Sequence, residues 1–254
     1  AVPATNDGIL IGDGAGQVEW IYLGQNSVET VFRGTESAPI REIVFTPNGE
    51  EFISLGQDRL IRVWNAADCI PARSWISSEE LPAALTLTPD GKQLIAADMD
   101  GQVRIWQLSD GQLVKQFAGH WKTATEKKGG LLEAFKSIFG AEEEPKGSLY
   151  SIGSLEITPE STHVAVTSGE DFIRIFDLKT GKQVQTLKGF PASANAACFL
   201  SAEKLVTGDN DGNLVVWDWK SAKQLRTHKL DGAVLALIAS PSREQLVAGL
   251  ENAK

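Results

Sequence analysis

Short runs of alternating apolar and polar residues recur along this chain, and each run ends at a turn signal. Residues 41–45, 51–55, 94–97 and 164–167 are typical of these runs and are rich in Val, Ile and Leu. Pro-Asn-Gly, Pro-Asp-Gly and Asp-Gly sequences separate them, and such sequences favour tight turns because proline presets φ and glycine tolerates a positive φ. Period-2 alternation over such short runs predicts β-strands. We therefore expect an all-β protein.

One of these runs is repeated at a nearly constant interval. Its copies read DGQVRIWQL at 100–108, DGNLVVWDW at 211–219 and DRLIRVWNA at 58–66, with weaker copies at 170–178 and 15–23. The residues at the shared apolar or aromatic position are Ile21, Trp64, Trp106, Phe176 and Trp217. Successive spacings are 43, 42, 70 and 41 residues. The chain is thus a repeat with a period of about 42 residues, and the long interval contains an insertion of about 28.

Each period holds four short strands, which we call a, b, c and d. A turn such as Thr88-Pro89-Asp90-Gly91 separates strands a and b, an Asp-Gly turn separates b and c, and strand c ends at the shared aromatic position. A four-stranded sheet of this size cannot bury both of its faces alone. Radial stacking of such sheets buries them, which predicts a β-propeller with four-stranded antiparallel blades.

The units resemble WD40 repeats, in which an Asp-Gly hairpin precedes an apolar strand that ends in Trp-Asp or a variant. The pairs here are Trp217-Asp218, Phe176-Asp177, Trp64-Asn65 and Trp106-Gln107, and a Gly-His pair stands at Gly119-His120. The resemblance covers nearly the whole chain except residues 121–146, and it implies a structural role within the blades for Trp64, Trp106, Phe176, Trp217 and His120. The Thr-Pro-Asp-Gly turns are similar to those of bacterial WD40 chains with degenerate repeats, which are often fused to other domains.

The family often links Asp, His, Ser or Thr, and the Trp of one blade by hydrogen bonds. His120 falls in the unit of Phe176, which has no N–H to donate. The units of Trp64, Trp106 and Trp217 lack the Gly-His pair. We therefore expect packing, rather than this polar network, to hold the blades together.

The repeat count gives five to six blades. The first predicted strand, 8–12, and the last, 245–249, are both of type b, and the chain begins with Ala1 while its one methionine is Met99. We expect residues 1–254 to be a propeller that is incomplete at one or both ends, and part of a seven-bladed ring by family habit. A five-bladed ring with one redundant strand is the alternative.

Residues 121–146 form the insertion between two blades. An apolar face with helical spacing predicts a short amphipathic helix over 131–139. Lysines before this segment and glutamates after it oppose the helix dipole, so the helix needs a docked face to be stable. It either docks on its own propeller or enters the groove of a partner protein, and the glutamates disfavour a membrane surface. The predicted partner contacts here are Trp121, Leu131, Leu132, Phe135, Ile138 and Phe139.

The b–c turns carry carboxylates. Asp58, Asp100 and Asp211 each precede an aromatic residue by six positions, and Asp98, Glu170, Asp171 and Asp209 lie close by in sequence. They are either turn residues that bond their own backbone or an acidic rim for a partner. Antiparallel alternation puts b–c turns and d–a connections at one end of the blades. We therefore predict an interaction face that combines Asp58, Asp100 and Asp211 with the insertion.

The sequence contains few residues that could form a catalytic, metal-binding or cofactor-binding site. The three histidines have no metal-ligand spacing, and Gly14–Gly16 lies in a hairpin rather than before a helix, where phosphate loops lie. Cys69 and Cys198 are predicted in a c–d turn and a strand a, too far apart to bridge. Arg41, Glu42 and Glu156 are the charged residues of the predicted inner strands and form no recognisable set. We predict no catalytic, cofactor-binding or metal-binding residues.

The net charge and the length of the apolar runs restrict the kinds of partner that this chain could bind. The net charge is -9, from 24 Lys and Arg against 33 Asp and Glu, which argues against binding to nucleic acid. No apolar run reaches the roughly 18 residues of a membrane span, so we expect a soluble protein without membrane insertion, cytoplasmic rather than periplasmic. The sequence predicts a non-enzymatic scaffold that binds protein partners. A propeller enzyme or cofactor protein with a site in its central channel is one alternative. A docking or sensor segment of a larger multidomain enzyme is the other, with further domains of the same polypeptide as partners.

Overall fold

The computed structural model describes residues 8–23, 28–35, 38–99, 101–118, 154–167, 172–240 and 242–251. In these ranges the regular elements are β-strands, arranged as six antiparallel sheets in chain order. The predicted insertion helix lies outside the described residues. So do Asp100, His120, Trp121, Leu131, Leu132, Phe135, Ile138, Phe139, Glu170 and Asp171.

We number the sheets as blades. Blade 1 contains β1 (Gly8–Gly12), β2 (Gln17–Leu23) and β3 (Val28–Thr35). Blade 2 contains β4 (Ile40–Phe45), β5 (Glu51–Gly56), β6 (Leu60–Asn65) and β7 (Pro71–Ile76). Blade 3 contains β8 (Pro82–Leu87), β9 (Gln93–Asp98), β10 (Gln102–Gln107) and β11 (Leu113–Ala118). Blade 4 contains β12 (Leu155–Ile157), β13 (His163–Thr167), β14 (Phe172–Asp177) and β15 (Gln183–Lys188). Blade 5 contains β16 (Ala194–Phe199), β17 (Lys204–Asp209), β18 (Asn213–Asp218) and β19 (Lys223–Lys229), and blade 6 contains β20 (Val234–Ala239) and β21 (Leu246–Leu250).

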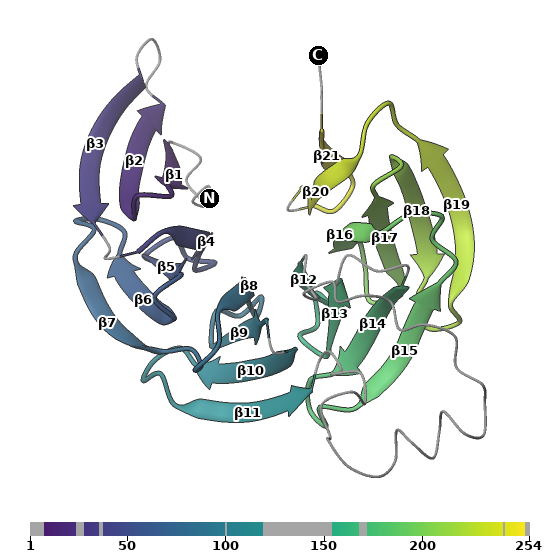
Figure 1. The fold of residues 1–254 in the computed structure, drawn as a ribbon, viewed down its shortest axis with the longest axis horizontal. Helices are drawn as coiled ribbons and strands as arrows, with labels where there is room; N and C mark the ends of the chain where they lie inside the picture. The colour runs from purple at the N-terminus through teal and green to yellow at the C-terminus, as the bar shows by residue number, and fades with distance from the viewer. Residues whose placement is uncertain are drawn as a thin grey trace, which may run out of the picture.

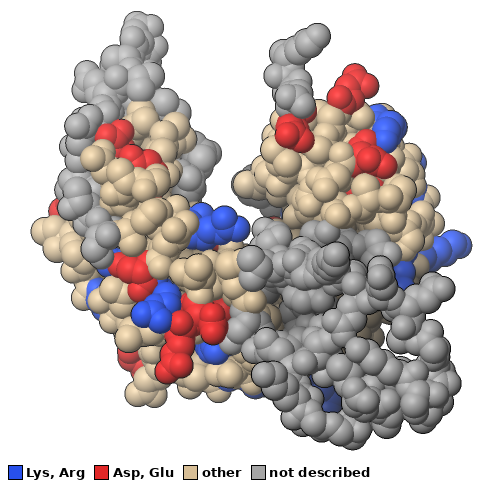
Figure 2. All heavy atoms as spheres, in the orientation of Figure 1, with Lys and Arg blue, Asp and Glu red and all other residues tan. Residues whose placement is uncertain are grey.

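The blades follow one another around an arc (Figure 1). The first strand of each four-stranded blade lies inside the arc and the last strand lies outside, so β4, β8, β12, β16 and β20 meet in succession around the centre. Figure 2 shows open space between the two arms of the arc, with Lys and Arg interspersed among Asp and Glu on the face in view. The arrangement is a β-propeller, as the repeat predicts.

The core lies between neighbouring blades rather than in one central mass. In the described part of the chain the buried apolar residues form five clusters, and each cluster draws on two adjacent blades. The aromatic residues of strand c anchor four of these clusters, and Trp64, Trp106, Phe176 and Trp217 are each at most 3% exposed. Each joint between blades is therefore a separate hydrophobic interface.

Part of the polar network that the sequence analysis did not expect is nevertheless present, because a hydrogen bond from the indole to a Ser or Thr hydroxyl holds two of these Trp residues. Trp64 Nε1 donates to Ser54 Oγ at 2.8 Å, and Trp217 Nε1 donates to Thr207 Oγ1 at 2.8 Å. The acceptors lie on strand b beside the Trp, so no Gly-His pair is needed. In blade 3 the register position of Ser54 and Thr207 is held by Ala96, which pairs with Arg104 and carries no side-chain acceptor for Trp106.

A side chain of the outermost strand ties each of blades 2, 3 and 4 to the next blade. Arg73 Nε donates to Leu108 O at 2.9 Å, Lys115 Nζ to Leu178 O at 3.1 Å, and Gln185 Nε2 to Lys220 O at 2.9 Å. The acceptors all lie in the turn after strand c of the following blade. The three donors share one register position, opposite the residue that precedes the aromatic of strand c.

An apolar side chain two residues later completes each of these joints. It is Trp75, Phe117 or Leu187, and it packs into the cluster of the next blade. Gly111, at φ 69°, lies under Trp75, and a Cβ on this glycine would come within 2.7 Å of the indole. Glycine at the turn thus lets the two blades approach closely.

Both cysteines are buried and free, Cys69 in the turn after β6 and Cys198 in β16. Nowhere in the described ranges is there a helix with the length and hydropathy that a membrane crossing requires.

Candidate interaction surfaces

The b–c turns and the d–a connections lie at one end of the blades, which we call the b–c face. Backbone hydrogen bonds join the two kinds of loop directly: Ser77 N donates to Arg59 O at 2.7 Å, and Leu230 N donates to Gly212 O at 2.8 Å. Met99 N donates to Leu81 O at 2.9 Å in the same way. The shared end that strand alternation predicts is therefore present in blades 2, 3 and 5.

Two carboxylates predicted for an exposed acidic rim are buried instead. Asp98 is fully buried and forms an ion pair with Arg104 across β9 and β10. Asp209 is 1% exposed, and its carboxylate accepts hydrogen bonds from Asp211 N at 3.0 Å and from Asn213 N and Nδ2 at 2.8 Å. Because desolvated carboxylates need such partners, these two residues stabilise their turns, and their assignment to a surface rim is wrong.

Asp58 is also engaged within its own hairpin. Its carboxylate pairs with Arg62 through contacts of 2.5 and 3.2 Å and accepts from Leu60 N at 3.1 Å. Asp211, in contrast, is exposed on the b–c face. Of the three aspartates predicted to contact a partner, the structure therefore leaves Asp211 open, occupies Asp58 internally, and does not describe Asp100.

The connection between β7 and β8 is an exposed apolar feature that the sequence patterns did not single out. Ile76 is 68% exposed and Leu81 49% exposed, and the exposed Glu79 and Glu80 lie between them. We call these four residues the β7–β8 patch. The only sequence signal is the polar segment Ser-Ser-Glu-Glu between two large apolar residues, a common pattern that does not separate a binding loop from an ordinary one.

Hydrogen bonds fix the loop that carries this patch. Ser77 Oγ donates to Arg59 O at 2.9 Å, and Ser78 Oγ donates to Glu80 O at 2.9 Å. Arg59, from the b–c turn of the same blade, donates through Nη1 to Glu79 O at 2.7 Å. The exposed apolar side chains are thus held out by an ordered backbone, which lowers the entropy lost when a partner binds.

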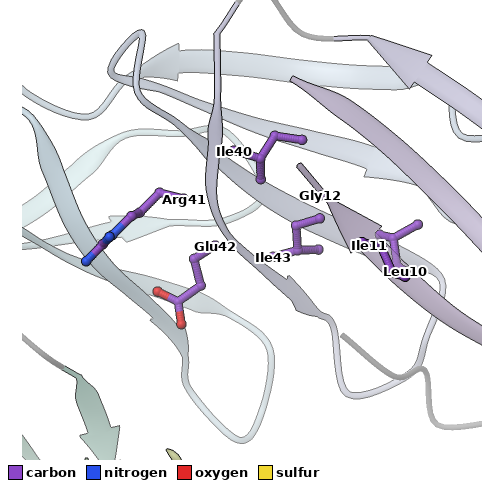
Figure 3. A pocket seen from close by; sticks show the side chains of 7 residues that line it. All are labelled: Leu10, Ile11, Gly12, Ile40, Arg41, Glu42 and Ile43. Carbon is purple, nitrogen blue, oxygen red and sulfur yellow. The ribbon is translucent and has the colours of Figure 1, made fainter. Parts of the chain in front are cut away.

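A groove of about 310 Å³ lies between β1 and β4, toward the centre of the arc. It is lined by Leu10, Ile11, Gly12, Ile40, Arg41, Glu42 and Ile43 (Figure 3). Its two charged residues also join blade 2 to blade 3, because Arg41 Nε donates to Ala83 O at 3.0 Å and Glu42 Oε2 accepts from Leu85 N at 2.6 Å. The charged groups of this inner strand therefore have a structural role at the joint.

Two carboxyls of the inner strands have raised pKa values. Burial raises the pKa of Glu42 to about 7, against the opposing effects of the Leu85 hydrogen bond and the Arg41 charge. Burial and the charge of Glu42 raise the pKa of Glu156 to about 8, and Arg243 opposes this rise. In the described ranges, no group of three or more His, Cys, Asp or Glu side chains could hold a metal ion.

His163 lies at the joint between blades 4 and 5. Its ring centroid is 4.9 Å from that of Trp219, and its Nδ1 is 2.8 Å from Thr162 Oγ1. Burial lowers its pKa, and the nearby Asp177 partly offsets this effect. His228, on β19, is exposed. The two described histidines lie on adjacent blades, His163 on the second strand of blade 4 and His228 on the outermost strand of blade 5.

Repeated antiparallel sheets around an arc, four of them with a buried aromatic at the end of the third strand, define the chain as a β-propeller. The family model for the WD domain, G-beta repeat, matches residues 26–65, 82–107 and 181–218. These segments cover β3–β6, β8–β10 and β15–β18, and each ends one residue after the Trp of strand c in blade 2, 3 or 5. WD40 repeats are therefore present in this chain at the three matched segments.

Three curated relatives are similar to parts or most of the chain. Denticleless protein homolog of Danio rerio is 29% identical over 101 residues, which cover 36% of this chain and 16% of the relative. The Homo sapiens homolog is 30% identical over 76 residues, 29% of this chain and 10% of the relative. Apoptotic protease-activating factor 1 of Rattus norvegicus is 24% identical over 252 residues, 94% of this chain and 18% of the relative. The chain thus spans less than a fifth of the length of each relative.

Proposed function

We propose that this chain is a non-enzymatic module that binds a protein partner through its b–c face. WD40 repeats generally mediate protein–protein interactions and are typically non-enzymatic. The observation that carries the proposal is the β7–β8 patch, where Ile76 and Leu81 stand 68% and 49% exposed on a loop fixed by hydrogen bonds. Exposed apolar side chains on an ordered loop are typical of binding anchors.

The charges around the patch indicate the chemistry of the partner. Glu79, Glu80 and Asp211 are exposed on the same face, and the whole chain carries a net charge of -9. A partner segment with an apolar side chain flanked by Lys or Arg would fit both features. The insertion at 121–146 is a d–a connection, so the proposal includes its predicted contacts, Trp121 and the apolar residues of 131–139, on the same face.

The inner strands support this proposal over an enzyme in the channel. Arg41 and Glu42 bond the backbone of β8. The thiol near Glu156 is that of Cys198, which is buried, and burial raises its pKa to about 11, so it is held as an unreactive thiol. A docking or sensor segment within a longer protein is a second candidate, which the match of 94% of this chain to 18% of a longer relative supports. It would use the same face, and the same experiment tests both.

The test is an affinity capture with the purified chain from cell extract, followed by mass spectrometry and direct binding of the captured proteins. The I76D/L81D variant should lose the captured partners, because it places charge at both apolar anchors. The matched control is V184D on β15, where Val184 is 47% exposed but lies on an outer strand. Deletion of residues 121–146 tests the insertion separately. Retention of every partner by both altered proteins would overturn the proposed face.

A further inference from the structure

Blades 4 and 5 carry lysines at three positions of the repeat where blades 2 and 3 have none. These positions lie three, six and twelve residues after the aromatic of strand c, in the c–d turn and at the two ends of strand d. The six lysines, which we call the lysine surface, are Lys179, Lys182, Lys188, Lys220, Lys223 and Lys229. The corresponding residues of blades 2 and 3 are Ala67, Ile70, Ile76, Ser109, Gln112 and Ala118.

The exposure of the lysine surface is a property of these positions in the repeat. All six lysines are exposed, and so are the six corresponding residues of blades 2 and 3. Blades 2 and 3 are each followed by a complete four-stranded blade, so a neighbouring blade does not cover these positions. They lie at the outermost strand of each blade (Figure 1), and Figure 2 shows Lys and Arg at the outer edge of the arm that carries β19.

The carboxylates that directly follow the strand c aromatics of blades 4 and 5 are engaged by their own turns. Asp177 accepts hydrogen bonds from Thr180 N at 2.6 Å and from Thr180 Oγ1 at 2.7 Å, and Asp218 accepts one from Ser221 N at 3.3 Å. Thr180 and Ser221 stand where the corresponding turns of blades 2 and 3 have aspartates. The c–d turns of blades 4 and 5 therefore carry one acidic residue fewer at this position.

Two of the six ammonium groups have contacts within the chain, but the positive charge of the surface is retained. Lys220 forms an ion pair with Glu203 at 3.7 Å at an exposed site, and Lys229 donates to the carbonyl oxygen of Asp211. Exposed ion pairs contribute little free energy, and a main-chain carbonyl carries no net charge. Residues 172–230 contain nine Lys and Arg against five Asp and Glu, in a chain whose net charge is -9. The lysine surface is thus a positive region on an acidic protein.

The lysines form two neighbouring rows. Lys182 and Lys188 are six residues apart along the extended backbone of β15, which corresponds to about 20 Å. The lysines at the two ends of strand d on β19 repeat this spacing. Gln185 Nε2 donates to Lys220 O at 2.9 Å, so the c–d turn of blade 5 contacts β15 directly. The length of each row fits an extended peptide of about seven residues.

We propose that the lysine surface binds an extended acidic segment of a partner protein. Carboxylates along such a segment would pair with the ammonium groups of both rows, and the complementary charge would speed association. The inference goes beyond the proposed function, because it assigns a second surface whose preferred partner has the opposite charge from that of the b–c face.

The charge and shape of the molecule favour a protein segment over other polyanions. A nucleic acid that extends beyond the lysine surface would meet the acidic excess of the remaining chain, and β15 and β19 contain no Phe, Tyr or Trp on which bases could stack. These two strands follow the convex outside of the arc (Figure 1), so a flat lipid bilayer would not reach both rows along their length. A short acidic segment can follow this curvature and end within the surface.

The probe is a fluorescein-labelled synthetic peptide of alternating Glu and Ser, and a Gln-Ser peptide of the same length is the control. Fluorescence anisotropy measures the binding of each peptide to the purified chain at two salt concentrations. We expect saturable binding of the Glu-Ser peptide, and binding of the Gln-Ser peptide that is weaker by about tenfold or more. The affinity for the Glu-Ser peptide should fall as salt rises, because salt screens exposed charges.

The variant K182Q/K188A/K223Q/K229A gives blades 4 and 5 the residues that blade 3 has at the same positions, so it should fold, which circular dichroism melting verifies. It should weaken binding of the Glu-Ser peptide by about tenfold or more.

A matched pair of single variants separates the lysine surface from net charge. K182E should weaken binding by about threefold or more, whereas K92E should leave the affinity within about twofold. Both variants change the net charge equally, and the Lys92 side chain is 74% exposed in the turn between β8 and β9. The I76D/L81D variant should bind the peptide normally, so failure of the b–c face and failure of this inference are separate results. In the affinity capture, partners of the lysine surface are those that the four-lysine variant loses and I76D/L81D keeps.

Three outcomes would overturn the inference. The first is no saturable binding of the Glu-Ser peptide. The second is binding that the four-lysine variant leaves unchanged, or that K182E and K92E weaken equally. The third is tighter binding of a single-stranded DNA oligonucleotide, or of phosphatidylcholine vesicles that contain phosphatidylserine, when the four-lysine variant loses that binding. This last result would assign the lysine surface to a nucleic acid or to a membrane.

Discussion

Trp64 and Ser54 are joined by a hydrogen bond of 2.8 Å from the indole Nε1 to the hydroxyl across β5 and β6. Both residues are buried, so the S54A variant would leave a buried N–H group without this acceptor. We expect a loss of about 1–3 kcal/mol in the free energy of unfolding. Urea denaturation followed by tryptophan fluorescence measures it.

The matched control for this bond is T207S in blade 5, which keeps a hydroxyl for Trp217. It should cost less than T207V, which removes the acceptor while keeping the shape. Equal stabilities of T207S and T207V would mean that packing alone holds that indole.

The joint between blades 2 and 3 predicts a strong effect of G111A. The added Cβ would lie 2.7 Å from the Trp75 ring, and the backbone of Gly111 has φ 69°, which L side chains rarely adopt. Strain of both kinds should lower the free energy of unfolding by about 1–3 kcal/mol. G14A is the control, because a Cβ at Gly14 meets no atom within 4 Å. A G111A protein as stable as G14A would contradict this account of the joint.

Breaking the buried ion pair of Asp98 and Arg104 should lower the free energy of unfolding more than breaking a surface ion pair does. Asp98 is fully buried, so R104M would leave its carboxylate desolvated and without its cation, at a cost of about 3–5 kcal/mol. Lys92 and Asp90 form an exposed pair at 3.8 Å, and K92M should change stability by less than about 1 kcal/mol. Urea midpoints of the two variants give the comparison. Similar small effects in both would show that Asp98 finds other partners.

The raised pKa values of Glu42 and Glu156 predict that the free energy of unfolding falls as pH rises from about 5 to about 8. The folded pKa values of Glu42 and Glu156, about 7 and about 8, lie above the ordinary value of 4.5. The folded state therefore binds more protons than the unfolded state in this window, and ionisation of either group in the fold is unfavourable. Groups that face them are Arg41, Arg243 and Cys198.

Urea unfolding of the wild type and of E42Q and E156Q at pH 5, 6.5 and 8 tests this pH dependence. Each variant should flatten the profile, and the carboxyls interact, so the double variant should flatten it most. A wild-type profile that rises over this window would refute the prediction.

The repeat in the sequence predicted the architecture because period-2 runs and turn chemistry are local signals. The strand predicted at 94–97 is β9 (Gln93–Asp98), and that predicted at 41–45 is β4 (Ile40–Phe45). Ser54 and Thr207 were missed as indole acceptors, since their role depends on the register between strands b and c. Asp98 and Asp209 were predicted at the surface but are buried. A position beside a turn in the sequence does not show whether a carboxylate is exposed or is buried with ion-pair or hydrogen-bond partners. The compartment and the bacterial character of the repeats stay predictions.

In the hydrogen bond at each joint, only one of the two blades needs a particular kind of side chain. The donor is a side chain of strand d, but the acceptor is a main-chain carbonyl that any residue at that position supplies. A substitution in the accepting turn therefore leaves the bond available, and Arg, Lys and Gln all serve as donors. The hydrogen bond therefore does not oblige neighbouring blades to change together, whereas the apolar side chain two residues later still needs a turn that leaves room for it, as Gly111 does under Trp75.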